Sequence, residues 1–207
     1  MFNLKAGVAA ALFLALTAGA QANTNLVADG SFSEGAGVGA FGTISAGGNI
    51  GGAWNVTGGS VDLIGSYWSA PSGYSIDLDG NSPGAISQDL SLAPGGYLLT
   101  FSLAGNPDGG DATKTVEVSI DGITRDFTFT TTGHSRGDMG WTTGSIYFSN
   151  VDATTTLSFT SKDAGGPFGA ALADISVTAV PEPEAISLML AGVGLVGVMA
   201  ARRKRSV

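Results

Sequence analysis

Five aromatic residues are of a type that could bind a ligand by stacking. The candidates are Trp54, Tyr67, Trp68, Tyr74 and Trp141. Their flat faces can stack on the CH faces of sugar rings, while neighbouring Asp, Asn or Gln side chains bond to the hydroxyls. The alternative is packing, because Trp and Tyr are also common in cores and at corners. Tyr67 and Trp68 are adjacent, so in a strand one of the two points outward. We therefore keep the five as candidates for glycan binding.

A second motif suggests hydrolase chemistry but lacks its partners. Residues 133–137 read Gly-His-Ser-Arg-Gly and match the G-x-S-x-G nucleophile elbow. That elbow needs a His base that follows the Ser in the chain, but His134 is the only His and directly precedes Ser135. Side chains of adjacent residues in an extended segment point to opposite sides. The sequence predicts a loop here and no catalytic residue.

Of 207 residues, 33 are Gly and none is Cys, which removes disulfides, thiolate metal sites and Cys nucleophiles.

The charge of the central part of the chain disfavours nucleic acid as a partner. Residues 23–180 hold fifteen Asp or Glu against four Lys or Arg, a net charge of −11 (4 minus 15). A field of this sign repels phosphate backbones, so we expect no nucleic-acid partner.

Period-two alternation dominates residues 23–179 and predicts sheets with one buried face. Leu99, Phe101 and Leu103 alternate with Thr100 and Ser102, and further runs do the same over 116–120, 127–130, 146–148, 157–159 and 175–177. Asp121-Gly122 between two such runs predicts a hairpin. Eight to ten short strands separated by turn residues predict a single all-β sandwich.

One stretch departs from this pattern. Residues 35–59 hold ten glycines and only scattered apolar residues, so we interpret them as loops with weak strand content.

The N-terminus has the three parts of a secretory signal peptide over residues 1–22. Lys5 precedes an apolar stretch over 6–16, and Ala20-Gln21-Ala22 supplies a small-residue cleavage site. The apolar stretch is too short to span a membrane. We expect export and cleavage after Ala22 by signal peptidase.

The C-terminus, residues 180–207, predicts a membrane segment with a fixed orientation. Residues 185–201 are apolar and uncharged, and at about 1.5 Å per residue they reach the short end of a bilayer span. A basic tail, 202–207, follows with Arg202, Arg203, Lys204 and Arg205, which the positive-inside rule keeps in the cytoplasm.

A Pro-Glu-Pro motif stands before this helix, in residues 180–184. The order of Pro181-Glu182-Pro183, a short apolar helix and an Arg-rich end resembles the PEP-CTERM sorting signal. The resemblance implies a membrane peptidase of the exosortase type as partner and a Gram-negative bacterium as source. The chain would then be a precursor anchored in the inner membrane, with its mature form at the cell surface or outside the cell. A permanent anchor with a Pro-rich stalk is the alternative.

The body carries a second resemblance over residues 25–178. It opens with Asn25-Leu26-Val27-Ala28-Asp29-Gly30-Ser31-Phe32, continues with Pro94-Gly95-Gly96-Tyr97 and closes with Ala173-Asp174-Ile175-Ser176-Val177. This order resembles the choice-of-anchor C family, which implies a galactose-binding-like jelly roll with an extracellular, polysaccharide-associated role.

The resemblance also bears on metal binding. Carboxylates near the opening Phe and the closing strand can contribute to a structural Ca²⁺ site in such folds, and here Asp174 and Glu34 remain as candidates. Ca²⁺ needs six to eight oxygen ligands, so Asp174 as a plain turn carboxylate stays open. Asp77-Leu78-Asp79-Gly80-Asn81 lacks EF-hand spacing and is interpreted as a polar turn.

Three functions remain open. The first is a non-catalytic surface or extracellular-matrix protein associated with exopolysaccharide. The second is a carbohydrate-active enzyme of the glycoside hydrolase type, since carboxylates are plentiful although no pair stands out. The third is a structural or adhesive protein that binds other proteins.

Overall fold

The computed structural model describes residues 24–35, 37–181 and 190–196. The predicted signal peptide, Glu182 and Pro183 of the sorting motif and the basic tail lie outside these residues, as does most of the predicted membrane segment. Residues 190–196 are helical and exposed. No helix within the described part of the chain combines the length and the apolar character that a membrane crossing needs.

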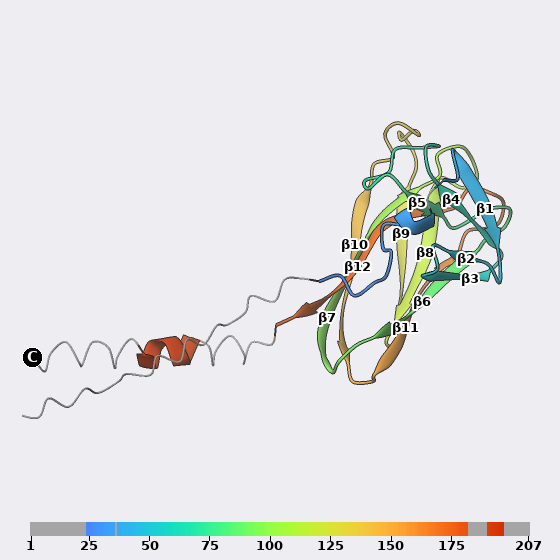
Figure 1. Cartoon of the computed structure of the whole chain (residues 1–207). Coiled ribbons are helices and arrows are strands. Elements are labelled where there is room, and N and C mark those ends of the chain that lie inside the picture. The colour runs from blue at the N-terminus through green and yellow to red at the C-terminus, as the bar shows by residue number, and fades with distance from the viewer. Residues whose placement is uncertain (1–23, 36, 182–189, 197–207) are drawn as a thin grey trace, which may run out of the picture. The chain divides into compact units, whose positions relative to one another are not determined.

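The body consists of two antiparallel sheets of six strands each (Figure 1). The short 3₁₀ turn η1 (Ser33–Gly35) precedes them. In spatial order, sheet A contains β1 (Phe41–Ser45), β4 (Ser60–Ile64), β5 (Ser75–Asp77), β12 (Ala170–Val180), β7 (Gly95–Gly105) and β10 (Thr142–Asn150). In the same way, sheet B contains β2 (Asn49–Ile50), β3 (Trp54–Gly58), β6 (Ala85–Ser91), β11 (Thr154–Ser161), β8 (Thr113–Ile120) and β9 (Ile123–Thr130). Neighbours in each sheet are mostly distant in sequence, which confirms the predicted jelly-roll sandwich.

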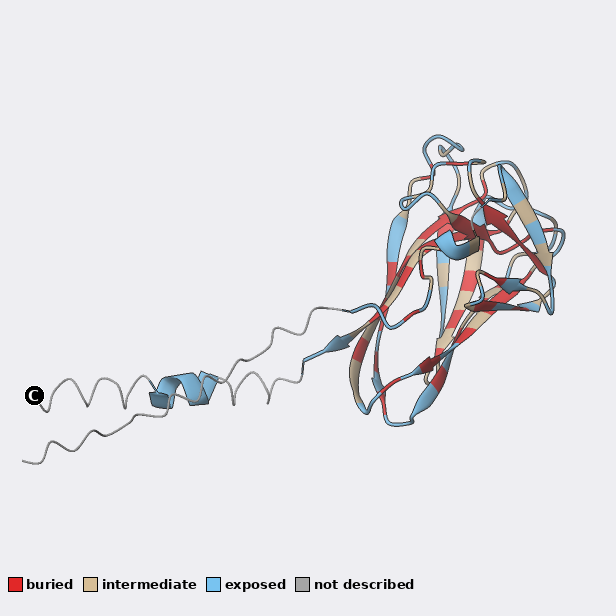
Figure 2. Cartoon of the chain, viewed as in Figure 1, coloured by how far each residue is buried: buried red, intermediate tan, exposed pale blue. Residues whose placement is uncertain are grey.

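The core lies where the predicted alternation places it. Along β7, Leu99, Phe101 and Leu103 are buried while the residues between them are only partly covered. On β11, Leu157 and Phe159 have no exposed surface. Figure 2 shows buried residues alternating with less buried ones along the strands. Each fully buried side chain of this size contributes about 1.5–3 kcal/mol, so alternation holds the two sheets together.

The hairpin prediction is confirmed. Asp121 and Gly122 connect β8 to β9, and both have positive φ angles, 51° and 73°. Two central residues with positive φ define a type I′ turn, whose twist matches that of the flanking strands.

The glycine-rich stretch has more regular structure than we expected. It contains β1, β2 and β3, and the described residues hold twelve strands where the sequence predicted eight to ten. The glycines lie mainly in the turns, while Ile50, Trp54 and Val56 are buried. Tertiary packing of these three side chains therefore overrides the weak local preference for strand.

The N-terminal segment of the body is fixed to the last strand through one side chain. The amide nitrogen of Asn25 donates to the carbonyl of Ile175 at 2.9 Å. Its Oδ1 accepts from the backbone N–H groups of Val27 and Val177, both at 3.0 Å. The backbone N–H of Leu26 also donates to Val177 at 2.9 Å. Asn25 thus closes the sandwich by joining the start of the body to β12.

We expect Asn25→Ala to lower the free energy of unfolding by about 1–2 kcal/mol, because three hydrogen bonds are lost together. Urea unfolding of the body measures this change. Asn49→Ala is the matched control, since this exposed Asn makes a single hydrogen bond, to Asn55 at 3.2 Å. Equal effects of the two substitutions would show that Asn25 does not join the segments.

Candidate functional site

The candidate site lies on the outer face of sheet A, over β1, β4 and β5. Leu63 pairs with Ile76 across β4 and β5, and both side chains point into the core with 1% and 0% exposure. Because side chains alternate along a strand, Asp62 and Asp77 lie on the opposite face. They are direct cross-strand partners, and Asp62 also pairs with Thr43 of β1. The register therefore builds a polar row across three strands.

A pocket of about 220 Å³ opens over this row. One half of its lining is apolar. Phe41 of β1 and Ile64 of β4 are partners in the neighbouring row. Tyr67 and Trp68 follow β4 in the chain, and Phe168 comes from the loop before β12. Phe41 is 46% exposed, which leaves its ring accessible to a ligand.

The other half of the lining is polar. Oδ1 of Asp62 accepts a hydrogen bond of 2.5 Å from the hydroxyl of Thr43. Asn81 and Asn106 add amide groups to the same lining. The lining thus contains aromatic rings together with a carboxylate and amides, the groups that can contact a sugar ring.

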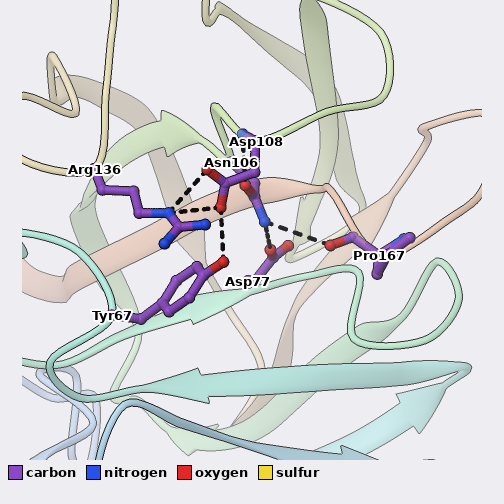
Figure 3. Close-up of polar contacts among 6 residues, drawn as sticks. All are labelled: Tyr67, Asp77, Asn106, Asp108, Arg136 and Pro167. Carbon is purple, nitrogen blue, oxygen red and sulfur yellow. Dashed lines mark hydrogen bonds and ion pairs between the residues drawn. The ribbon is translucent and has the colours of Figure 1, made fainter.

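Asp77 forms part of the pocket floor but is only 1% exposed. Its Oδ1 accepts from the backbone N–H groups of Asp79 and Gly169, both at 3.0 Å. Its Oδ2 accepts from the amide of Asn106 at 2.7 Å (Figure 3). The interpretation of this segment as a plain polar turn is therefore wrong for Asp77, which ends β5 and holds the neighbouring loops in place.

The Tyr67 ring is fixed by three neighbours at the rim of the pocket. Its hydroxyl donates to Asp108 at 2.9 Å, and Nε of Arg136 donates to both oxygens of the same carboxylate at 2.9 Å (Figure 3). The guanidinium of Arg136 lies 4.1 Å from the centre of the ring, and Phe41 meets the ring edge-on at 5.2 Å. One face of Tyr67 is thus covered by a cation, and its orientation is set before any ligand binds.

The structure separates the five aromatic candidates. Tyr67 and Trp68 line the pocket, although Trp68 is only 4% exposed. Trp54 is wholly buried against Phe32 and Phe159 at ring distances of 5.7 and 6.2 Å, so its role is packing and its place among the glycan-binding candidates is a correction.

The remaining two candidates lie elsewhere. Tyr74 and Trp141 pack partly against the core, and neither lines this pocket. The indole of Trp141 donates to the carbonyl of Ser69 at 2.8 Å. Phe41 and Phe168 take their place in the pocket, and sequence reasoning missed both because only the register and a loop bring them there.

The predicted metal ligands lie on a second pocket of about 460 Å³, which Asp29, Glu34 and Asp174 line. The Asp29 carboxylate is occupied by the backbone N–H of Glu34 at 3.2 Å, and Asp174 accepts a hydrogen bond from Ser72. Among the described residues, no group of three or more His, Cys, Asp or Glu side chains is gathered closely enough to hold a metal ion. The Ca²⁺ site at Asp174 and Glu34 therefore stays a prediction.

The sequence matches two family models. Residues 25–177 match the model described as "Protein of unknown function (DUF642)". The chain belongs to this family. The match spans the stretch that resembles the choice-of-anchor C family and is consistent with it. Residues 179–205 match the PEP-CTERM protein-sorting motif, which confirms the predicted sorting signal. This motif implies export, processing by an exosortase and association with the cell surface.

The chain is also similar to halomucin and to several solved structures. Halomucin of Haloquadratum walsbyi is 34% identical over 135 residues, which are 63% of this DUF642 chain but only 1% of halomucin. Among solved structures, TmCBM61 in complex with beta-1,4-galactotriose is 16% identical with a TM-score of 0.47, over 76% of this chain and 99% of that one. The CBM22-1 xylan-binding domain of Paenibacillus barcinonensis is 13% identical with a TM-score of 0.45, over 68% and 94%. The family description names no activity.

Two buried carboxyls, those of Asp77 and Asp79, make the stability of this DUF642 domain depend on pH. Burial raises the pKa of Asp77 from 3.8 to about 8, against the opposing effect of its hydrogen bonds from Asp79, Asn106 and Gly169. Burial likewise raises the pKa of Asp79 from 3.8 to about 6. Between pH 3.8, the ordinary pKa, and the raised pKa of each group, the folded state binds more protons than the unfolded state. The free energy of unfolding therefore falls as the pH rises through this range.

We therefore expect the free energy of unfolding to decrease from pH 4 to pH 8, and Asp77→Asn to make this slope shallower. Urea unfolding at a series of pH values measures both slopes. Asp152→Asn, which removes an exposed carboxylate, serves as the control and should leave the slope nearly unchanged. A slope that stays the same in Asp77→Asn would contradict the assignment.

Proposed function

We propose that this chain is a non-catalytic, exported surface protein whose sandwich domain binds a glycan of extracellular polysaccharide in the pocket over β1, β4 and β5. The observation that carries the proposal is the lining of that pocket, which combines aromatic rings with hydrogen-bonding side chains. A pyranose offers partners to both, with apolar CH faces and polar hydroxyls around its edge. Aromatic surface and a few convergent polar groups are also the usual features of small-ligand sites.

The polar groups of the pocket suit hydroxyls in particular. Asp62 is bonded to Thr43 through Oδ1 and is 8% exposed, so it can accept a further hydrogen bond from a ligand. Asn81 is exposed and offers both a donor and an acceptor. A sugar hydroxyl both donates and accepts, so it can satisfy the two side chains at once.

The hydrolase alternative is weakened by the state of Asp77. Asp62 and Asp77 are neighbouring carboxyls on one pocket, which is the arrangement that a glycosidase would need. Both oxygens of Asp77 are already occupied by protein donors, and the residue is almost fully buried. Asp77 therefore holds the loops in place, and a single accessible carboxyl does not make an acid and base pair.

The sorting signal gives the proposed route. Signal peptidase would cleave after Ala22, and the apolar helix over 185–201 would hold the precursor in the inner membrane with Arg202–Arg205 in the cytoplasm. An exosortase would then recognise Pro181-Glu182-Pro183 and remove the helix. The mature body would reach the surface or the surrounding matrix, where the polysaccharide lies.

Phe41→Ala is expected to weaken binding to the cell's own exopolysaccharide about tenfold, because it removes an exposed ring from the pocket. Tyr67→Ala should weaken it further, since the ring also positions Arg136 and Asp108. Affinity electrophoresis or calorimetry with the purified body measures the change.

Tyr147→Ala is the matched control for these variants. This ring is 57% exposed and lies on β10, the opposite edge strand of sheet A from β1. It should bind like the wild type. Equal binding by all four proteins would exclude the pocket, binding to a protein partner alone would favour the adhesive alternative, and turnover of the glycan would favour the enzyme.

Replacing Arg202–Arg205 by Ala, or Pro181-Glu182-Pro183 by Ala, should block removal of the C-terminal segment in the producing cell, because the peptidase loses its recognition elements. Immunoblotting of membrane and medium fractions shows whether the longer form accumulates. Arg125→Ala, which changes an exposed residue of β9, is the control. Normal maturation of both sorting variants would contradict the exosortase route.

A further inference from the structure

The geometry of the pocket points to recognition of a chain end: we propose that it takes one terminal sugar ring of a neutral polysaccharide and excludes the interior of the chain. The inference rests on the proposed function and adds which part of the glycan binds and what charge it carries. Three features support it. The floor is closed at one end, the walls are fixed by hydrogen bonds, and the carboxylate of Asp62 has no Lys or Arg beside it in the lining.

The floor of the pocket ends at β5. The row from Thr43 through Asp62 to Asp77 continues in register to Ala171 of β12 and Ala104 of β7. Both of these alanines have 0% exposure. The polar row therefore runs from the open edge strand β1 into a region that is completely covered, and a polymer lying along it cannot continue across the sheet.

The wall at this closed end is tied to the floor. The amide of Asn106 donates to Asp77 at 2.7 Å and to the carbonyl of Pro167 at 3.4 Å (Figure 3). The backbone N–H of Gly169 also donates to Asp77 at 3.0 Å. The loops that follow β7 and precede β12 are thus joined through one buried carboxyl, so displacing them would leave that carboxyl without its partners.

Along the strands the pocket is flanked by residues that are held in place. At one end Tyr67 is held by Asp108 and Arg136. At the other end the backbone N–H groups of Gly80 and Asn81 donate to the carbonyl and hydroxyl of Ser60 at 2.9 and 2.7 Å. The pocket volume of about 220 Å³ is below the roughly 300–1,000 Å³ typical of pockets for drug-sized ligands, which suits a single ring.

The charge inside the pocket selects against acidic rings. Asp62 lines it, and no Lys or Arg is among the lining residues. The nearby cation, Arg136, already pairs with Asp108 at 2.9 Å. A uronic acid would bring its carboxylate next to Asp62 in a partly desolvated site, where like charges repel more strongly than in water. A terminal ring that carries only hydroxyls avoids this repulsion.

Counting binding sites before and after fragmentation of the polysaccharide tests the chain-end reading. A β-galactan, a β-glucan and the cell's own exopolysaccharide are partially hydrolysed, which raises the number of ends per gram without changing the composition. Isothermal titration with the purified body should then show that doubling the ends doubles the sites per gram, at unchanged Kd. If the number of sites per gram stays constant or decreases while binding persists, chain-end recognition is overturned and the proposed function is left intact. Absence of binding to all three polymers, whole and fragmented, would overturn the proposed function itself.

Oxidation of the primary alcohols to carboxylates tests the charge selection on the same fragments. The wild type should bind oxidised fragments at least tenfold more weakly than neutral ones, and Asp62→Asn should reduce this difference while still binding neutral fragments. Tyr147→Ala should discriminate as the wild type does, and thermal melting confirms that each variant is folded. If Asp62→Asn is unfolded, the wild type alone tests the charge selection. Raised salt should then reduce the difference in its affinity for neutral and oxidised fragments. Equal binding of neutral and oxidised fragments to the wild type would overturn the charge selection.

Discussion

The register between β4 and β5 is the constraint on which both the core and the pocket depend. It pairs Leu63 with Ile76 on the inner face and Asp62 with Asp77 on the outer face. A shift of β5 by one residue would turn Asp77 into the space between the sheets and Ile76 out of it. Burying an unpaired carboxyl there would cost several kcal/mol. The demand for a dry core therefore fixes the position of the polar row.

Asp77 shows how a buried carboxyl is stabilised by the chain around it. The loop before β12 approaches so closely that it needs a residue without a side chain, since a Cβ at Gly169 would lie 2.7 Å from the backbone nitrogen of Asp79 and 2.8 Å from Oδ1 of Asp77. That approach lets the Gly169 N–H reach the carboxyl at 3.0 Å. Gly169 thus allows the loop before β12 to pack against Asp77, and the packed loop forms one wall of the pocket.

The sequence predicted those parts of the fold that depend on local pattern. Leu99, Phe101 and Leu103 alternate within one strand, and Asp121-Gly122 can form its turn without distant partners, so both were accessible from the residues alone. The strands in the glycine-rich segment were not, because they exist only through pairing with β4 and β6.

The site was harder to predict for the same reason. Trp54 and Tyr67 were candidates by residue type alone, but one is buried and the other lines a pocket. Phe41 becomes a pocket residue only because β1 pairs with β4, and Asp77 becomes a structural carboxyl only because Asn106 reaches it from another loop. Contacts across long stretches of chain decide such roles, and a single sequence shows no periodicity for them.

The position of β12 gives the domain a direction. The strand starts beside Phe168 at the pocket and ends at Val180, directly before Pro181, and it has eleven residues from Ala170 to Val180. At about 3.3 Å per residue, roughly 35 Å of central strand separates the two ends. A body held by its C-terminal end would therefore present the pocket on its distal side. Tension between a captured polymer and the cell would run lengthwise through β12, so the hydrogen bonds to β5 and β7 would share the load in shear instead of opening one after another.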